Sequence, residues 1–458
     1  MENCKRKKHV LAIAYPAYGH TTPLLGLCRK LCRYHNVTFA VSGFIANRMR
    51  EREFRNLEAG ESITLYPIDD GAPADTQFKV DKWHKAHDVL MNHVHPGVRQ
   101  LMSQVATLNQ SGTAFEITRP VDVVIFDMWF APTVMTTKVP GILYYYFNGT
   151  PSYFLRYLLL LKDVTETCPV EKHDWFQDLP PPGKMLGPQL DMLLSEMGPL
   201  GKYLPLVDGV INNSHRAVDQ QDIEILEKDR GMPGVKIFCL GPFLSDSTTP
   251  VTDEMDAKLV RWLDKQKPRS VLYISFGSMA APTEQQLHEI GTALLGLNVP
   301  FIWTLRKGHE EKLPHEILIK MSDQSEDDSN RSFWIVPWAP QTAILNHPST
   351  GAYLSHCGWN SALESMSAGV PIVAWPLFAD QRSNARMLVK RGAAIMMEGT
   401  NILFKRLVPT REIEKAIEAV LSEPAYRNSM DVFRGEITDA LSESGSSTKE
   451  LHEFVQFA

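Results

Sequence analysis

The sequence predicts an α/β protein with two domains, each built on a doubly wound parallel sheet. Three observations carry this prediction. The chain has 458 residues, which is too long for one ordinary hydrophobic core. Apolar runs of strand length alternate with helical stretches in both halves. A polar, proline-containing stretch at residues 245–254 (SDSTTPVTDE) separates the halves.

The first half begins with a strand of the buried kind, because residues 9–15 are almost all apolar. A loop and a helix follow this strand, and we place Pro23 in the first helical turn. We expect residues 1–244 to form the first domain. Its further strands are predicted at residues 37–42, 66–68, 121–126 and 139–147, and FCLGPF at 238–243 closes the half.

The second half repeats the alternation after a linker at residues 245–255. Its domain is predicted at residues 256–436, with strands at 270–276, 300–305 and 333–336. A last helical segment, residues 437–458, follows this domain.

A box of 44 residues, Trp338 to Gln381, has the layout of a nucleotide diphosphate site. Gly369 stands where a helix C-cap belongs, so Asn360 and Ser361 fall in the first turn of a helix. The N–H groups of that turn are unpaired and the helix dipole is positive there, which attracts phosphate. His356 precedes this turn, and Gly358 allows the backbone to approach a ligand closely.

The same box offers groups for the rest of a nucleotide sugar. Glu364 shares the helix face of Asn360 and Ser361, so its carboxylate can accept hydrogen bonds from ribose hydroxyls. Trp338 presents a ring that can stack on uracil. Asp380 and Gln381 follow the apolar strand PIVAW, where open α/β sheets place ligand contacts.

A second set of polar residues follows strands of the first half. We place His20 on the loop after the first strand and Asp127 at the end of the strand VDVVIFDMWF. Such a pair can act as a general base, with the Asp fixing the imidazole tautomer. Asp122 is the alternative partner, but it lies at the wrong end of its strand. In the second half, Ser278 follows a strand and a Gly, where its hydroxyl can bond a phosphate oxygen or cap a helix.

The box and the segment YPAYGHTTP around His20 resemble the motifs of plant-type UDP-sugar-dependent glycosyltransferases of family 1. The resemblance implies a GT-B fold, in which two Rossmann-like domains face each other across a cleft. The N-terminal domain would bind the acceptor, the C-terminal domain would bind the UDP-sugar, and the closing helix would return to the first domain.

The resemblance also implies a role for each matching residue. His20 would deprotonate the acceptor hydroxyl with support from Asp127. Trp338 would stack on uracil near Ala339 and Gln341, and Glu364 would hold the ribose. The diphosphate would contact Ser278, His356, Asn360 and Ser361, and the sugar would contact Trp359, Asp380 and Gln381. Gln381 and Trp359 favour glucose.

The acceptor pocket is less defined by the sequence. Aromatic and apolar residues of the first half could line it, although each of them is also a candidate for the core. We take Tyr18, Phe130, Phe147 and Tyr153 as acceptor residues, with Tyr146, Phe154 and Leu200 as further candidates.

Composition narrows the class of protein. A net charge of −6 argues against a nucleic-acid partner. No apolar run reaches membrane-spanning length, and the basic start lacks a signal-peptide core. The six cysteines form no CxxC pair, so we expect reduced thiols and a cytoplasmic location. We also expect a monomer.

The sequence therefore predicts inverting transfer of glucose from UDP-glucose to a hydroxyl of a small hydrophobic phenol, flavonoid or alcohol, without a metal or other cofactor. The same fold could instead use UDP-GlcNAc, UDP-xylose or UDP-galactose. A non-catalytic nucleotide-sugar-binding protein is a third interpretation, which the presence of both His20 and Asp127 disfavours. A Rossmann dehydrogenase is excluded because no GxGxxG follows the first strand.

Overall fold

The computed structural model divides the chain into two units. Unit 1 comprises Met1–Phe243 with Asp439–Ala458, and unit 2 comprises Leu244–Thr438. The last segment of the chain therefore belongs to unit 1. Residues 245–253 of the predicted linker lie outside the described residues, which are 6–52, 63–70, 83–111, 117, 119–161, 197–228, 232, 234–244, 254–278, 281–322, 331–400 and 406–457.

Unit 1 is built on a seven-stranded parallel sheet of order β3-β2-β1-β4-β5-β6-β7. The order reverses direction between β1 and β4, which makes the sheet doubly wound. The strands are β1 His9–Ile13, β2 Asn36–Ser42, β3 Ile63–Ile68, β4 Val123–Asp127, β5 Leu143–Asn148, β6 Gly209–Asn212 and β7 Lys236–Cys239.

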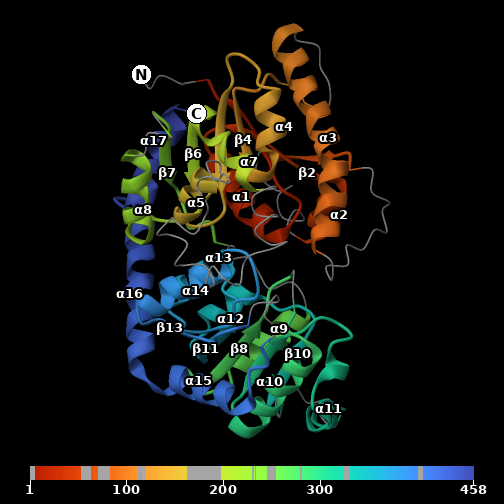
Figure 1. Ribbon diagram of the computed structural model, residues 1–458, viewed down its shortest axis with the longest axis vertical. Helices are drawn as coiled ribbons and strands as arrows, with labels where there is room; N and C mark the ends of the chain where they lie inside the picture. Colours follow the sequence, from red (N-terminus) through yellow and green to blue (C-terminus); the bar gives the residue numbers. More distant parts are fainter. Residues whose placement is uncertain are drawn as a thin grey trace, which may run out of the picture. The chain divides into compact units, whose positions relative to one another are not determined.

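Both faces of this sheet are covered, because alternate residues of β1 belong to two different cores. Leu11 and Ile13 face one hydrophobic cluster, and Val10 and Ala12 face the other. Figure 1 shows the helices that surround the sheet. They are α1 Tyr18–Leu31, α2 Gly43–Arg52, α3 Trp83–Ser111, η3 Met128–Phe130, α4 Ala131–Thr136, α5 Tyr153–Leu161, α7 Gly198–Gly201, η8 Leu204–Leu206 and α8 Arg216–Lys228.

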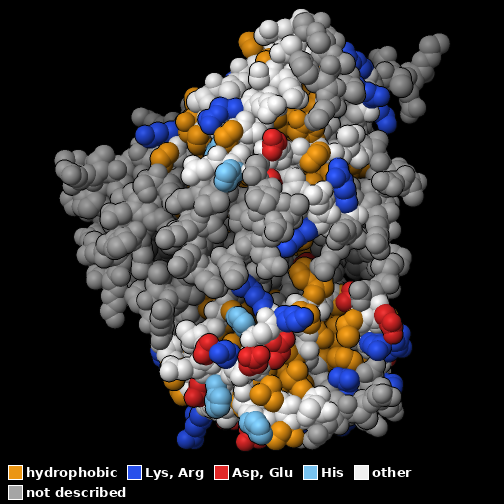
Figure 2. Space-filling view, turned by 90° about the vertical axis from the view of Figure 1, so that its right-hand side faces the viewer, with side chains coloured by type: hydrophobic (Ala, Val, Ile, Leu, Met, Phe, Trp, Pro, Cys, Tyr) orange, Lys and Arg blue, Asp and Glu red, His pale blue; other side chains and the backbone are white. Residues whose placement is uncertain are grey.

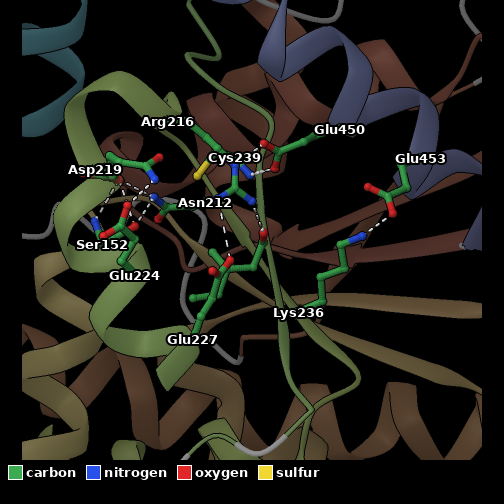
Figure 3. A network of polar contacts seen from close by, with 12 residues as sticks. Ser152, Asn212, Arg216, Asp219, Glu224, Glu227, Lys236, Cys239, Glu450 and Glu453 are labelled. Atoms are coloured by element: carbon green, nitrogen blue, oxygen red, sulfur yellow. Dashed lines mark hydrogen bonds and ion pairs between the residues drawn. The ribbon is translucent and has the colours of Figure 1, made fainter. Parts of the chain in front are cut away.

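The C-terminal helix α17, Ser446–Phe457, packs on β7 within unit 1. Its Phe454 is fully buried, with its ring centroid 4.9 Å from that of Tyr145 and 5.4 Å from that of Phe238. Glu450 accepts hydrogen bonds from Arg216 Nε at 2.5 Å and from the backbone N of Cys239 at 2.7 Å (Figure 3). Apolar burial and these charged hydrogen bonds together hold the helix against the sheet.

Unit 2 repeats the doubly wound design with a six-stranded parallel sheet of order β10-β9-β8-β11-β12-β13. Its order reverses between β8 and β11. The strands are β8 Val271–Ser275, β9 Phe301–Thr304, β10 Phe333–Val336, β11 Thr350–Ser355, β12 Ile372–Ala374 and β13 Ala394–Met396. The helices are α9 Glu254–Leu263, α10 Glu284–Leu297, η9 Glu310–Lys312, α11 His315–Ser322, α12 Gln341–Asn346, α13 Trp359–Ala368, α14 Gln381–Lys390, α15 Thr410–Ser422 and α16 Pro424–Leu441.

The predicted strands occur with ends shifted by a few residues, but β6, β11 and β13 were not predicted. β6 and β13 contain four and three residues, which leaves little length for a sequence pattern to show. β11, TGAYLS, mixes apolar residues with small and polar ones, so it does not stand out as an apolar run. Gly369 ends α13 with a left-handed φ of 69°, as predicted. The placement of His20 on a loop is wrong, because α1 already begins at Tyr18. The carbonyl of Ala17 accepts from the N–H groups of His20 and Thr21, so the first turn closes before Pro23.

Two predictions from composition concern the absence of a membrane span and the absence of a nucleic-acid partner. None of the helices in the described ranges is long and apolar enough to cross a membrane. Figure 2 shows one face of the molecule, on which Lys and Arg side chains adjoin Asp and Glu side chains in the lower half of the picture and are scattered among other side chains in the upper half. The expectation that nucleic acid is not a partner stays a prediction.

Candidate functional site

Unit 1 brings His20 and Asp127 together at the point where its strand order reverses. Asp127 is the last residue of β4, and His20 lies in the first turn of α1, directly after β1. Because β1 and β4 are neighbouring parallel strands, their carboxyl ends meet at one edge of the sheet. This is the edge at which open α/β sheets bind ligands.

The two side chains form a hydrogen bond of 2.8 Å between His20 Nδ1 and Asp127 Oδ2. Asp127 is buried, and its other oxygen accepts from the backbone N of Trp129 at 3.3 Å, so the carboxylate has a defined orientation. The His20 side chain is 28% exposed. The centroid of its ring lies 4.9 Å from the ring centroid of Tyr15. With Nδ1 bonded to Asp127, proton transfer by this imidazole would use Nε2.

Asp122, the alternative partner of His20, accepts a hydrogen bond from a different residue. Its Oδ2 accepts from the backbone N of His9 at 2.8 Å, at the amino end of the neighbouring strand β1. It therefore lies at the opposite edge of the sheet from His20, as its position before β4 predicted.

The predicted acceptor residues divide into two groups. Tyr18 in α1 and Tyr153 at the start of α5 are partly exposed. Phe130 and Phe147 have no exposed surface and lie in the two hydrophobic cores of unit 1. The assignment of these two phenylalanines to an acceptor pocket is contradicted, since a fully buried ring offers no surface to a ligand. Sequence alone could not separate the groups, because both lie beside buried strands.

Unit 2 brings the segments that carry Ser278 and His356 together at its own reversal point, between β8 and β11. Gly277 and Ser278 follow β8, and His356 and the N-terminus of α13 follow β11. A Cβ atom placed on Gly277 would lie 2.5 Å from His356 Nε2, and one placed on Gly358 would lie 2.6 Å from the same atom. The imidazole therefore fills the space that these two glycines leave open.

His356 is neutral at physiological pH in this environment. Burial lowers the pKa of its ring to about 4, and the backbone of Ser275 opposes only part of this shift. A neutral imidazole carries one N–H, so His356 can donate a hydrogen bond to a phosphate but adds no positive charge.

Gln341 and Glu364 form a partly buried hydrogen-bonded group next to Ser361. Gln341 Nε2 donates to Glu364 Oε2 and to Ser361 Oγ, the latter at 3.1 Å, while its Oε1 accepts from Tyr353 at 2.9 Å. Thr342 donates to the other oxygen of Glu364 at 3.2 Å. Burial raises the pKa of Glu364, and the hydrogen bonds from Gln341 and Thr342 oppose the rise. Each carboxylate oxygen keeps lone pairs that could accept from sugar hydroxyls.

Asp380 and Gln381 lie at the start of α14. Gln381 Oε1 accepts from the backbone N–H groups of Leu377 and Phe378, at 2.8 and 3.1 Å, which fixes its side-chain amide. Asn384, one turn later, donates at 2.9 Å both to Asp380 Oδ2 and to the carbonyl of Cys357. Asn384 therefore joins the start of α14 to the segment that carries His356, a role that we did not predict. Its spacing from Asp380 is the signal that could have found it.

The remaining predicted donor residues differ in exposure. Trp338 is 50% exposed after β10, whereas Ala339 is buried. The side chain of Trp359 is also buried, so this residue would offer a ligand mainly the backbone N–H at the start of α13. Ser278 is exposed, and its carbonyl accepts from Arg306, a cation on the loop after β9 that we did not predict.

The cysteines and histidines give no sign of a metal centre in the ranges that the structure describes. No group of three His, Cys, Asp or Glu side chains that could hold a metal ion occurs there. Cys28, Cys32, Cys239 and Cys357 are buried thiols, whereas Cys4 and Cys168 lie outside the described residues.

Comparison with known proteins adds independent observations. The family described as "UDP-glucoronosyl and UDP-glucosyl transferase" matches residues 242–434. Hydroquinone glucosyltransferase of Rauvolfia serpentina is 29% identical, over 98% of this chain and 97% of its own. Anthocyanidin 3-O-glucosyltransferase 5 of Manihot esculenta is 28% identical, over 96% of this chain and 93% of its own.

A solved structure shows the same fold over the full length. Phytolacca americana UGT2 complexed with UDP-2fluoro-glucose and pterostilbene matches with a TM-score of 0.77 at 24% identity, covering 99% of both chains. The two doubly wound units are therefore those of a GT-B fold, which confirms the predicted fold class.

Proposed function

Because the chain belongs to the plant-type UDP-sugar-dependent glycosyltransferases of family 1, we propose that it transfers glucose, with inversion, from UDP-glucose to a hydroxyl of a small hydrophobic phenol. The observation that carries this proposal is the His20–Asp127 pair at the carboxyl edge of the unit 1 sheet. A partly exposed imidazole held by a buried carboxylate is a suitable general base for a hydroxyl group.

In the proposed reaction, His20 Nε2 removes the proton of the acceptor hydroxyl. The oxygen attacks the anomeric carbon of the sugar from the face opposite the diphosphate, and the bond between that carbon and the diphosphate oxygen breaks. Asp127 stabilises the imidazolium that forms, as the carboxylate does in serine hydrolases. Inversion follows from this single displacement.

The groups of unit 2 would hold UDP as it departs. His356 is placed to donate its one N–H, and Ser278, Asn360 and Ser361 add further donors near the N-terminus of α13. Glu364 would accept from the ribose hydroxyls. Since His356 is neutral, its contribution to the departing phosphate is a directed hydrogen bond and not a charge.

Glucose and a phenol are the substrates that the combined observations favour. Gln381 and Trp359 stand where the family resemblance associates them with glucose. Two full-length relatives are named a hydroquinone glucosyltransferase and an anthocyanidin 3-O-glucosyltransferase. On the acceptor side, Tyr18 and Tyr153 are the candidate residues with exposed surface. A partly exposed aromatic ring can stack on a phenol.

The test is acceptor-dependent release of UDP from UDP-glucose, with His20→Ala as the control. Wild-type protein is expected to release UDP only when a phenol is present. The His20→Ala variant is expected to bind UDP as tightly in calorimetry but to release none above background. Full activity of the variant would rule out His20 as the base, and tight UDP binding without release by the wild type would favour a binding protein.

We also propose that the enzyme works as a cytoplasmic monomer without a metal or other cofactor. Size-exclusion chromatography with light scattering checks the oligomeric state, and imaging of a tagged chain in its native cell checks the location. Metal independence predicts the same UDP release before and after treatment with EDTA, and a loss of release that Mg²⁺ restores would contradict it.

A further inference from the structure

Unit 1 contains a buried carboxylate that the proposed mechanism does not use. Asp219 lies in the first turn of α8 and is 2% exposed. It accepts three hydrogen bonds at one oxygen, from Ser152 N at 3.0 Å, Ser152 Oγ at 2.9 Å and Asn212 Nδ2 at 2.6 Å. Figure 3 shows Ser152 and Asn212 converging on this side chain. A carboxylate with three donors around it is held in one orientation.

The partners of Asp219 define the turn that leads into α5. Ser152 directly precedes Tyr153, the first residue of α5, and its Oγ also accepts from Asn212 Nδ2 at 2.8 Å. Asn212 ends β6, and its Oδ1 accepts from Asn148, which ends β5. Asn148 in turn donates to the carbonyl of Thr150 at 2.8 Å. The network therefore spans the whole connection from β5 to α5.

This connection lies at the same sheet edge as the His20–Asp127 pair. Strand β5 is paired with β4, and Phe147 stands opposite Asp127. Asn148 follows Phe147 by one residue, so the network begins one strand away from the proposed base. Tyr153, which the proposed function places on the acceptor side, is the first residue beyond it.

The charge state of Asp219 sets the strength of this hydrogen-bond network. Three hydrogen bonds converge on one oxygen of Asp219, and an ionised carboxylate accepts such bonds roughly twice as strongly as a neutral group does. Burial, which dominates, raises the pKa of Asp219 to about 6, although the hydrogen bonds from Ser152 oppose the rise. A proton on Oδ2 would replace a lone pair with an O–H donor at the oxygen that the three donors share, and a proton on the other oxygen would remove the negative charge that strengthens these bonds. In either case the contacts to Ser152 and Asn212 weaken.

The charged groups around Asp219 come from four elements. Asp222, on α8 itself, raises the pKa of Asp219 and pairs with Arg156 of α5. On the other side lies the thiol of Cys239 in β7, whose own pKa is raised by burial and by Asp219. Beyond it, Arg216 of α8 is paired with Glu450 of α17 (Figure 3). The Arg156–Asp222 pair ties the body of α5 to α8 independently of Asp219, so a change at Asp219 acts on the start of α5.

We propose that Asp219 is a positioning residue for the acceptor: its carboxylate holds the first turn of α5, and with it Tyr153, and protonation of that carboxylate releases the turn. The acceptor part of this inference rests on the proposed function. The enzyme would then bind its acceptor less tightly in mildly acidic conditions, independently of the protonation of His20.

The first experiment measures the turn itself, without a substrate. Amide hydrogen exchange at about pH 7.5 is compared for wild type, Asp219→Asn and the control Asp208→Asn. Asp208 accepts from the backbone N of Tyr144 at 2.8 Å, at the opposite end of β5. We expect faster exchange at Phe154 and Leu155 in Asp219→Asn alone, because the N–H groups of these residues close the first turn of α5. Unchanged exchange there would overturn the proposal.

The second experiment measures acceptor binding against pH in the His20→Ala background, which removes the titration of the proposed base. The probes are hydroquinone and 2-naphthol, whose hydroxyls stay protonated in this range because phenols have a pKa near 10. Kd is measured with saturating UDP and no sugar donor. If only the ionised form binds well, Kd should rise about tenfold one pH unit below the Asp219 pKa of about 6.

Adding Asp219→Asn to this background should raise Kd at about pH 7.5 and remove its pH dependence. Adding Asp208→Asn should change neither. An unchanged pH profile with Asp219→Asn would overturn the proposal. If the wild type releases no UDP with any phenol and binds neither probe, the proposed acceptor class fails, and the exchange measurement alone then decides whether Asp219 positions α5.

Discussion

Replacing Gly277 by alanine should disable the diphosphate side of unit 2 without touching a residue that contacts substrate through its side chain. The new Cβ would lie 2.5 Å from His356 Nε2 and 2.8 Å from Cε1, whereas ordinary contact begins at 3.4 Å. The imidazole would have to move by roughly 0.9 Å, which is the difference between the 2.5 Å separation and the 3.4 Å of ordinary contact. Gly358 is packed against the same ring nitrogen, which limits where the ring can go.

The size of the effect follows from what His356 supplies. A misplaced ring would lose the hydrogen bond to the departing phosphate that we propose for it, and loss of one such donor typically costs about 10²–10³ in rate, or about 3–4 kcal/mol. Gly277 also has a φ of 75°, where a residue with a Cβ is strained by roughly 1–2 kcal/mol. Steric displacement and backbone strain must therefore be separated.

Gly308→Ala provides that separation. Gly308 lies in the same unit with a φ of 89°, but a Cβ there would meet nothing within 4 Å. We measure kcat/KM for UDP-glucose at saturating phenol and the Kd of UDP by calorimetry. Gly277→Ala should lose about 10²-fold or more in kcat/KM, while Gly308→Ala should lose stability only. Equal activities of the two variants would refute the assignment of His356 to the diphosphate.

Three further predictions concern the geometry of each unit. Asp127→Asn should lower kcat by on the order of 10³-fold or more, with the Kd of UDP unchanged, because the amide cannot stabilise an imidazolium at His20. Asn384→Ala should lower the free energy of unfolding by about 1–3 kcal/mol and raise KM for UDP-glucose more than for the phenol, since it leaves Asp380 and the Cys357 carbonyl without this donor. The low pKa of His356 should make unit 2 acid-sensitive. Its unfolded form takes up a proton near pH 6.5 and its folded form only near pH 4, so about 3 kcal/mol of stability is lost across this window as pH falls.

Each of these predictions has a direct check. Steady-state kinetics with calorimetry tests Asp127→Asn, and a kcat near that of the wild type would contradict the pair. Thermal unfolding and the two KM values test Asn384→Ala, and an equal rise in both KM values would contradict its role in the donor half. Thermal unfolding of His356→Gln between about pH 7 and pH 4 should show a shallower loss of stability than the wild type, because that variant lacks the titrating ring.

The sequence predicted which site residues lie at the carboxyl ends of strands better than it predicted their burial and their hydrogen bonds. Strand ends are marked by a change from apolar to polar residues, so His20, Asp127 and Ser278 could each be assigned to the carboxyl end of a strand, whereas His356 could only be placed ahead of a helix. The sheet order then explains why they meet in pairs, because β1 adjoins β4 and β8 adjoins β11. That order comes from packing between segments far apart in the chain, and local patterns do not encode it.

The sequence could not predict which side chains are buried, nor which hydrogen bonds join segments far apart in the chain. Phe130 and Tyr153 are both aromatic residues near strand ends, yet one is enclosed by the core and the other is partly exposed. The low pKa of His356 depends on the glycines of two different segments, and the bonds of Asn384 depend on the approach of α14 to the His356 loop. Such properties arise from tertiary contacts, so they required the structure.

Proton NMR of the product formed from UDP-α-glucose and hydroquinone tests the central claim most directly. The account predicts a β-linked glucoside, recognised by the large coupling of its anomeric proton, from the wild type and none from His20→Ala. An α-linked glucoside would contradict a single in-line displacement by the oxygen that His20 activates. A β-glucoside made equally well by His20→Ala would contradict the base.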